Sequence, residues 1–234
     1  MKLGIMQPYL FPYIGYFQHI AFVDKFIAYD DVAFIKQGWI NRNRILLNGR
    51  DLMFTVKLKD ASSFTLIKDT QINDGLYESW KTKFYKTLEQ AYKKAPHFKA
   101  VFPLIKGVFE SENKSIGKLA LNSIKSICSY LEISTQFVDS SAIYNNTYLT
   151  AQTRVIDICK QENADKYINL KGGMELYSKK HFAEDSISLH FIGTKSITYP
   201  QFNHDFVPWL SVIDVLMFNT VAEIKSMLNQ YEIL

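Results

Sequence analysis

The sequence predicts an α/β fold with a mostly parallel, Rossmann-like central sheet and flanking helices. An apolar segment at residues 2–6 is followed by a loop, a helical segment and a second apolar segment at residues 25–31. Strand-like and helix-like segments alternate again from residue 135 onward. Between these parts, residues 77–131 contain three amphipathic segments, which predict a helical insertion. We expect one α/β domain over residues 1–234, because two full domains would need a longer chain.

Each element follows from a local pattern along the chain. Residues 7–15 contain Pro8 and Pro12, which predict a loop after the first strand. The dipeptide Asn48-Gly49 predicts the turn of a β-hairpin with arms at residues 39–47 and 52–58. The other expected strands are residues 64–72, 135–139, 166–170 and 188–192. The expected helices are residues 16–23, 77–94, 98–110, 115–131, 150–161 and 175–184, with closing helices within residues 212–230.

The composition is that of a soluble globular protein. Hydrophobic residues make up 47% and charged residues 21% of the chain, and no apolar run approaches the ~20 residues of a membrane span. The N-terminus lacks the pattern of a signal peptide, which predicts the cytoplasm. A net charge of +4, not gathered into a stripe, makes nucleic acid an unlikely partner. Cys128 and Cys159 lie in apolar helical patterns and are expected to be buried free thiols.

The loop after the first strand is the first candidate for ligand binding. Two prolines stiffen it, Gly15 permits close approach of a ligand, and a helix N-terminus follows. The layout resembles that of the HxGH nucleotidylyltransferases, but Tyr13-Ile14-Gly15-Tyr16 stands where their histidines would lie. The resemblance therefore implies the fold and a nucleotide pocket rather than adenylyl transfer. The alternative is a structural turn. The candidate residues here are Gln7, Tyr9, Tyr13, Gly15 and Tyr16.

Residues 30–44 form a second candidate segment, which combines two acids with several cations. Asp30 and Asp31 end a predicted strand, but a single acidic pair is a weak signal and predicts no metal site. Arg42 and Arg44 share one face of an extended segment, and two guanidinium groups on one face suit a phosphate or a carboxylate. A solvated hairpin face is the alternative. The candidate binding residues here are Lys36, Trp39, Asn41, Arg42 and Arg44.

Two later segments add further candidates. Gly172 and Gly173 follow a predicted strand and could present backbone N–H groups to an anion. In the loop at residues 199–208, His204 is the best general acid or base among the histidines, and Gln201 is a candidate for substrate binding. Ser211 fits the N-cap of the helix that follows better than a nucleophile.

Taken together, these segments resemble the WbqC-like family. The resemblance is carried by MQPYLFPYIGYFQHI, DDVAFIKQGWINRNRI, YINLKGGMELY and FNHDFVPWLSVIDVLMFN, and it covers nearly the whole chain. It implies a bacterial protein of surface-polysaccharide (O-antigen, lipopolysaccharide) biosynthesis. It also implies transfer of an acyl or aminoacyl group, glycine in one suggestion, to a nucleotide-linked or lipid-linked sugar. The expected partners are such a sugar or an activated amino acid.

An acyl transfer needs a base, donors for the oxyanion and a site for the activated acyl group. His204, Asp31 or Asp30 would be the base, and the backbone at Gly15, Gly172 and Gly173 would supply donors. Two alternatives remain open. One is an ATP-dependent activating enzyme with Mg²⁺ near Asp30 or Asp31, and the other is a non-enzymatic binding protein of the polysaccharide machinery. In the transferase, Lys36, Arg42 and Arg44 would hold phosphates, and Tyr9, Tyr13 and Trp39 would stack on rings.

Overall fold

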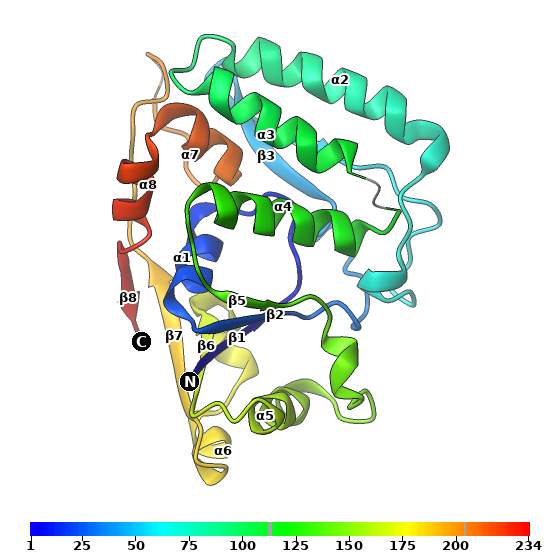
Figure 1. The fold of residues 1–234 in the computed structure, drawn as a ribbon, viewed down its shortest axis with the longest axis vertical. Coiled ribbons are helices and arrows are strands. Elements are labelled where there is room, and N and C mark those ends of the chain that lie inside the picture. Colours follow the sequence, from blue (N-terminus) through cyan, green and yellow to red (C-terminus); the bar gives the residue numbers. More distant parts are fainter. Residues whose placement is uncertain (112–113, 204) are drawn as a thin grey trace.

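The centre of the molecule is a mostly parallel sheet. The computed structural model describes residues 1–111, 114–203 and 205–234. Within these residues, six strands pair in parallel except for the last two, which are antiparallel (Figure 1). The predicted α/β fold is therefore confirmed. In spatial order the strands are β5 (Gln136–Val138), β2 (Lys25–Ala28), β1 (Lys2–Met6), β6 (Lys166–Leu170), β7 (Ser188–Thr194) and β8 (Tyr231–Ile233).

Helices and a separate hairpin surround this sheet. The hairpin consists of β3 (Arg42–Leu47) and β4 (Arg50–Thr55), and its turn residues Asn48 and Gly49 both have positive φ angles, as the predicted turn requires. The division into one domain with an insertion stays a prediction. The α-helices are α1 (Ile14–Phe22), α2 (Asp74–Tyr92), α3 (Phe98–Glu110), α4 (Ile116–Tyr130), α5 (Ala151–Gln161), α6 (Lys179–Glu184), α7 (Val212–Phe218) and α8 (Val221–Met227). The 3₁₀ helices are η1 (Ile67–Asp69), η2 (Ser141–Tyr144) and η3 (Lys171–Leu176).

The strand order places a topological switch between β1 and β6. From β1 the chain proceeds outward to β2 and β5, and it then returns to the other side of β1 to form β6 and β7. The loops after β1 and β6 therefore lead away from each other. In open sheets of this kind, ligands bind beyond the carboxyl ends of the strands, at or near such a switch.

The two faces of the sheet are covered by different helices. Leu3 and Ile5 of β1 pack into a core with α5, α6 and β7. Between them Gly4 faces α1 on the other side, because successive residues of a strand point to opposite faces. A Cβ on Gly4 would lie 2.8 Å from the ring of His19, so glycine allows α1 to approach the sheet closely. On this face a larger core joins α1, α3, α4 and α7 to the hairpin and α2 (Figure 1).

His19 is buried in this interface, and its burial leads us to expect a measurable pH dependence of the free energy of unfolding. Its Nε2 donates to the carbonyl of Ile168 at 2.8 Å, and burial lowers its pKa from 6.5 to about 4. Between these values only the unfolded chain takes up the proton. The stabilisation that neutral, buried His19 contributes to the free energy of unfolding is therefore complete above pH 6.5 and is lost as the pH falls toward 4. We expect a loss of about 2–3 kcal/mol in the free energy of unfolding between pH 7 and 4.5.

Urea unfolding of the wild type and of His19→Gln at both pH values measures this effect. The glutamine amide can still donate to Ile168 but does not titrate. Asp30 and Asp214, whose pKa values burial raises, are present in both proteins, so their opposite contribution cancels in the comparison. An equal pH dependence in the two proteins would show that His19 is not its source.

The structure differs from the expected elements in one strand that is absent and one strand that was not expected. Residues 64–72 do not form a strand but contain η1, and their backbone groups bond to several different segments. Ile67 N–H donates to Val32 and Lys68 N–H to Asp30, whereas Thr70 accepts from Ile116. The second correction is β8, at residues 231–233, where the sequence predicted no strand; three residues are too few to show alternation.

Other expectations from the sequence are confirmed. Cys128 and Cys159 are buried and free. The Ser211 side chain accepts from the Ile213 N–H and caps α7. Among the described residues, no helix has the length and apolar character needed to cross a membrane.

Candidate ligand-binding cleft

The loop between β1 and α1 is held in place by three distant segments. Phe11, at its centre, is buried with a positive φ of 43°, a conformation that bulky residues adopt rarely. Its N–H donates to Ser123 Oγ of α4 at 2.9 Å. Its carbonyl accepts from Asn43 Nδ2 of β3 at 2.9 Å and from Ser211 Oγ at 2.7 Å. The hairpin, α4 and the start of α7 thus fix the loop, and the side chains that follow it are well positioned.

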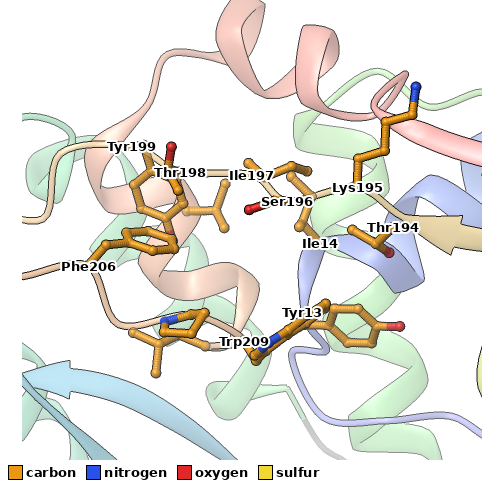
Figure 2. Close-up of a pocket in the computed structure, with 13 residues that line it drawn as sticks. Tyr13, Ile14, Thr194, Lys195, Ser196, Ile197, Thr198, Tyr199, Phe206 and Trp209 are labelled. Carbon is orange, nitrogen blue, oxygen red and sulfur yellow. The ribbon is translucent and has the colours of Figure 1, made fainter.

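A cavity of about 420 Å³ opens beside this loop. Its walls come from the start of α1, from the segment that continues β7, and from the segment before α7 (Figure 2). Figure 2 shows Tyr199 and Phe206 on one side and Ile14 and Thr194 on the other, with Tyr13 and Trp209 next to each other. The lining is aromatic and aliphatic, with a few polar groups. The polar side chains of the β7 continuation are Thr194, Lys195, Ser196 and Thr198.

A second cavity of about 200 Å³ adjoins the first. Both are lined by Tyr13 and Trp209, whose rings meet edge to face with centroids 5.9 Å apart. We call the two cavities together the aromatic cleft. The smaller cavity is lined by Tyr9, Pro12, Tyr13, Trp39, Asn43, Arg44 and Trp209.

Trp209 is the most exposed ring of the aromatic cleft and has an unusual backbone. Its side chain is 59% exposed, and its φ is 59°. This backbone conformation costs free energy in a non-glycine residue, and such strained residues are often found at functional sites. The neighbouring residues hold it, because the Ser211 N–H donates to the Arg44 carbonyl at 2.9 Å and Leu210 is buried.

The start of α1 accommodates Tyr13 and Thr194 only because residue 15 is glycine. A Cβ there would lie 2.2 Å from Thr194 Oγ1 and 2.3 Å from Tyr13 Cε2. Burial raises the pKa values of Tyr13 and Tyr9, so both phenols are protonated at neutral pH and can donate hydrogen bonds.

Replacing Gly15 with alanine is therefore expected to lower the free energy of unfolding by about 1–3 kcal/mol through overpacking. Gly107→Ala is the matched control, because nothing lies within 4 Å of a Cβ at Gly107 in α3. That change should stabilise the helix by up to about 1 kcal/mol. Urea unfolding of both variants measures the difference. Equal effects of the two substitutions would contradict the close packing at Gly15.

A buried carboxylate fixes the wall that carries Tyr199. Asp214 of α7 is fully buried and accepts from Tyr92 Oη at 2.7 Å, Tyr199 Oη at 2.8 Å and Gln201 Nε2 at 2.7 Å. Gln201 also bonds to the N–H and the carbonyl of Val207. Burial raises the pKa of Asp214. This network ties Tyr199 and Val207 to α7 and holds the Tyr199 ring in the cleft.

The structure brings some of the predicted residues together in the aromatic cleft. Tyr9, Tyr13, Trp39 and Arg44 line it, and Gly15 lies beneath Tyr13. Tyr16 supports the cleft from inside, since it is fully buried and its hydroxyl donates to the Gln7 carbonyl at 2.7 Å.

Other predicted binding residues line neither cavity. Arg42 donates to the Gly38 carbonyl at 3.0 Å and to the Gln37 carbonyl, so it holds the turn before β3. Asn41 donates to the Val56 carbonyl at 3.0 Å. Gln201 is 2% exposed and belongs to the Asp214 network. Gln7, Lys36, Gly172 and Gly173 also lie outside the two linings.

The predicted catalytic acids lie in a separate cluster. Asp31 pairs with Arg154 Nη2 at 2.5 Å, both side chains are nearly inaccessible, and Ser141 donates to the same carboxylate. Asp30 accepts from Ser140 Oγ at 2.6 Å, and burial raises its pKa. His204, the predicted base, lies outside the described residues. In the part of the chain that the structure describes, no three His, Cys, Asp or Glu side chains gather as a metal site.

Several residues of the cleft were not predicted from the sequence. They are Thr194, Lys195, Ser196, Thr198 and Trp209, whereas Tyr199 and Phe206 lie in the loop at residues 199–208 that the sequence did single out. One signal was present: Thr194–Thr198 is a polar segment directly after a predicted strand, the same feature that singled out the three other loops. Trp209 had no comparable signal, because its place beside Tyr13 depends on long-range packing.

The aromatic cleft lies beyond the carboxyl ends of β1 and β7 in this mostly parallel sheet, the region where open α/β proteins commonly bind ligands. The chain belongs to the WbqC-like protein family, whose model matches residues 7–226. It is 31% identical over 226 residues, 95% of each chain, to a protein of Mycobacterium tuberculosis (strain ATCC 25618 / H37Rv) described as uncharacterized protein Rv1507c. No solved structure matches the chain.

Proposed function

We propose that this chain is an enzyme of surface-polysaccharide (O-antigen) biosynthesis. It transfers an acyl or aminoacyl group to a nucleotide-linked or lipid-linked sugar that binds in the aromatic cleft. The family resemblance supports the polysaccharide context. The observation that carries the substrate class is the cleft itself, in which aromatic rings surround a cavity large enough for a small ligand. Such rings stack on sugars and on bases.

The polar groups of the larger cavity suit the phosphates of a nucleotide-linked sugar. Lys195 is a flexible cation at the cavity, and Ser196 and Thr198 add hydroxyl donors. All three lie in the segment that follows β7, and Figure 2 shows Lys195 on the side away from Tyr199 and Phe206, Ser196 between the two sides and Thr198 beside Tyr199. The ring of the sugar or base would contact the Tyr13–Trp209 pair, with its phosphates toward Lys195.

In the transfer step the sugar amine or hydroxyl loses a proton to a base and attacks the acyl carbon, the carbonyl oxygen becomes an oxyanion that needs donors, and the bond to the activating carrier breaks so that the carrier leaves. The protonated phenols of Tyr9 and Tyr13 are suitable oxyanion donors. For the base, the ion pair of Asp31 with Arg154 favours His204 over Asp31, because the Asp31 carboxylate is buried and already holds a cation. A cytoplasmic location stays a prediction.

A second candidate is an enzyme that activates a carboxylate or a sugar phosphate with ATP. It is supported by the position of the larger cavity at the start of α1, beside Lys195 and two hydroxyls. Both candidates place a nucleotide in the same cavity. They differ in whether the reaction consumes ATP.

Mass spectrometry of the reaction products tests the proposal. The purified protein is incubated with a uridine-diphosphate-linked amino sugar and either acyl-coenzyme A or glycine with ATP and Mg²⁺. A sugar that gains the mass of the acyl group supports the transferase, and this product should be lost in Tyr13→Ala but retained in the remote control Phe64→Ala, whose ring is 96% exposed. ATP cleavage without sugar modification favours the activating enzyme. Sugar binding without any product favours the non-enzymatic binding protein.

A further inference from the structure

The smaller cavity of the aromatic cleft contains a cation with little to hold it. Arg44 lines this cavity and lies over the Trp39 ring at 5.6 Å. Its Nη1 is 3.3 Å from Asp51, and its Nη2 is 3.4 Å from the Trp209 carbonyl. Both distances are long for hydrogen bonds of a charged donor. Its Nε is buried and, among the described residues, has no hydrogen-bond partner.

Because its present contacts are long, the Arg44 guanidinium can donate hydrogen bonds to an anionic ligand. The two Nη groups make only long contacts, so a ligand oxygen could replace these with shorter, charge-assisted hydrogen bonds. Asp51 competes only weakly, because it is 49% exposed and ion pairs of this kind contribute little. The guanidinium carbon lies 5.6 Å from the centre of the Trp39 ring, a cation–π contact, and the planar guanidinium can donate two parallel hydrogen bonds to a planar group.

The surroundings favour a carboxylate over a phosphate. Arg44 is the sole cation among the residues that line the smaller cavity. The Asn43 amide there already donates to the carbonyls of Leu10 and Phe11, at 3.1 and 2.9 Å. Arg42 is turned toward the carbonyls of Gln37 and Gly38. A phosphate monoester carries a charge of about −1.5 to −2 on three acceptor oxygens, more than one guanidinium neutralises, whereas a planar carboxylate matches its charge and its fork. The aromatic walls suit the short carbon part of such a ligand.

We propose that the smaller cavity binds the carboxylate of a small organic acid or of an acidic sugar, through the guanidinium of Arg44. The inference rests on the proposed function in taking the aromatic cleft as the ligand site, and it adds the chemistry of one part of the ligand. The two cavities share the Tyr13–Trp209 pair, so a carboxylate bound in the smaller cavity would be separated from the larger cavity by these two rings.

Ligand-observed NMR titration tests the proposal with defined probes: acetate, glycine, glucuronate, inorganic phosphate and the neutral ester methyl acetate. The proteins are the wild type, Arg44→Lys, Arg44→Ala, Asp51→Asn and the control Arg50→Ala. Arg50 is exposed on the same hairpin and lines neither cavity. Arg44→Lys keeps the charge and removes the fork, and circular dichroism checks that each variant is folded.

Carboxylates should bind the wild type and Arg50→Ala with the same Kd, and methyl acetate should bind neither protein. Arg44→Lys and Arg44→Ala should weaken carboxylate binding by about tenfold or more, whereas Asp51→Asn should tighten it a few-fold. Tighter binding of glucuronate than of acetate and glycine identifies an acidic sugar as the source, and the reverse identifies a small acid. Carboxylate binding that survives in Arg44→Ala would overturn the proposal, as would phosphate that binds more tightly than every carboxylate and is retained by Arg44→Lys.

The failure of this inference and the failure of the proposed function are distinguishable. If carboxylates bind at Arg44 but no sugar is modified, the subsite stands and the transferase fails. If the sugar is modified by Arg44→Ala with unchanged KM for both substrates, the transferase stands and the carboxylate subsite fails.

Discussion

Arg154→Ala is expected to lower the free energy of unfolding by about 3–5 kcal/mol, because it leaves a buried carboxylate without its cation. Arg154 and Asp31 are 4% and 2% exposed, and their side chains meet at 2.5 Å. Arg154 Nε also donates to Asn146 Oδ1 at 2.9 Å, and its guanidinium lies 5.0 Å from the Tyr29 ring. The pair joins the end of β2 to α5 across the sequence. Removing one partner is therefore much worse than removing an exposed ion pair.

Urea unfolding of three variants measures this effect. Lys160→Ala is the matched control, because Lys160 pairs with Asp185 at 2.6 Å on the surface and its loss should cost at most about 1 kcal/mol. The double variant Asp31→Asn with Arg154→Met should recover much of the loss, since no charge then remains buried. A cost for Arg154→Ala no greater than that for Lys160→Ala would show that the pair is not a structural element, and would reopen a catalytic role for Asp31.

Trp209→Ala is expected to weaken binding of a nucleotide-linked sugar by about 10- to 100-fold. The ring contacts both cavities and stacks edge to face with Tyr13, and loss of one stacking ring typically costs about 1–3 kcal/mol. Isothermal titration with a uridine-diphosphate-linked amino sugar measures the change. Phe64→Ala, which removes an exposed ring outside the cleft, should leave the affinity unchanged. Equal affinities of the wild type and Trp209→Ala would contradict the place of the ligand.

The same position carries backbone strain, which a second substitution separates from binding. Because the φ of Trp209 is 59°, glycine should be more stable there than alanine by about 1 kcal/mol. Thermal unfolding of Trp209→Gly and Trp209→Ala measures this difference. Both variants lack the ring and should bind equally poorly, so affinity reports the ring and stability reports the backbone.

Local patterns predicted much of the fold and part of the site. The spacing of apolar residues and the residues typical of turns and caps predicted the parallel strands, the hairpin turn at Asn48-Gly49 and the cap at Ser211. Each of these depends mainly on residues that are neighbours in the sequence. The alternation of Arg42 and Arg44 predicted a shared face, and both guanidinium groups do lie over the Trp39 ring. Alternation could not show that Arg42 would turn back to the carbonyls before β3.

The remainder of the site depends on contacts between distant residues. Asp31 pairs with Arg154 and Asp214 with Tyr92, each more than a hundred positions away, and nothing near these acids in the sequence identifies a partner. The sequence therefore placed Asp31 at a strand end but could not show that its charge is buried in an ion pair with Arg154. Likewise, Trp209 reaches Tyr13 only through the packing of α7 against the first loop.

The central claim is that the aromatic cleft is the ligand site, and thermal unfolding with a ligand panel tests it most directly. Wild type, Trp209→Ala and Phe64→Ala are each heated with ATP, coenzyme A, glycine and nucleotide-linked amino sugars, with and without Mg²⁺. A ligand at about 100 times its Kd stabilises the folded protein by roughly 2.7 kcal/mol. The account predicts a higher Tm with a nucleotide or a nucleotide-linked sugar in the wild type and in Phe64→Ala, and a much smaller rise in Trp209→Ala. An undiminished rise in Trp209→Ala, or no rise with any nucleotide ligand in the wild type, would contradict it.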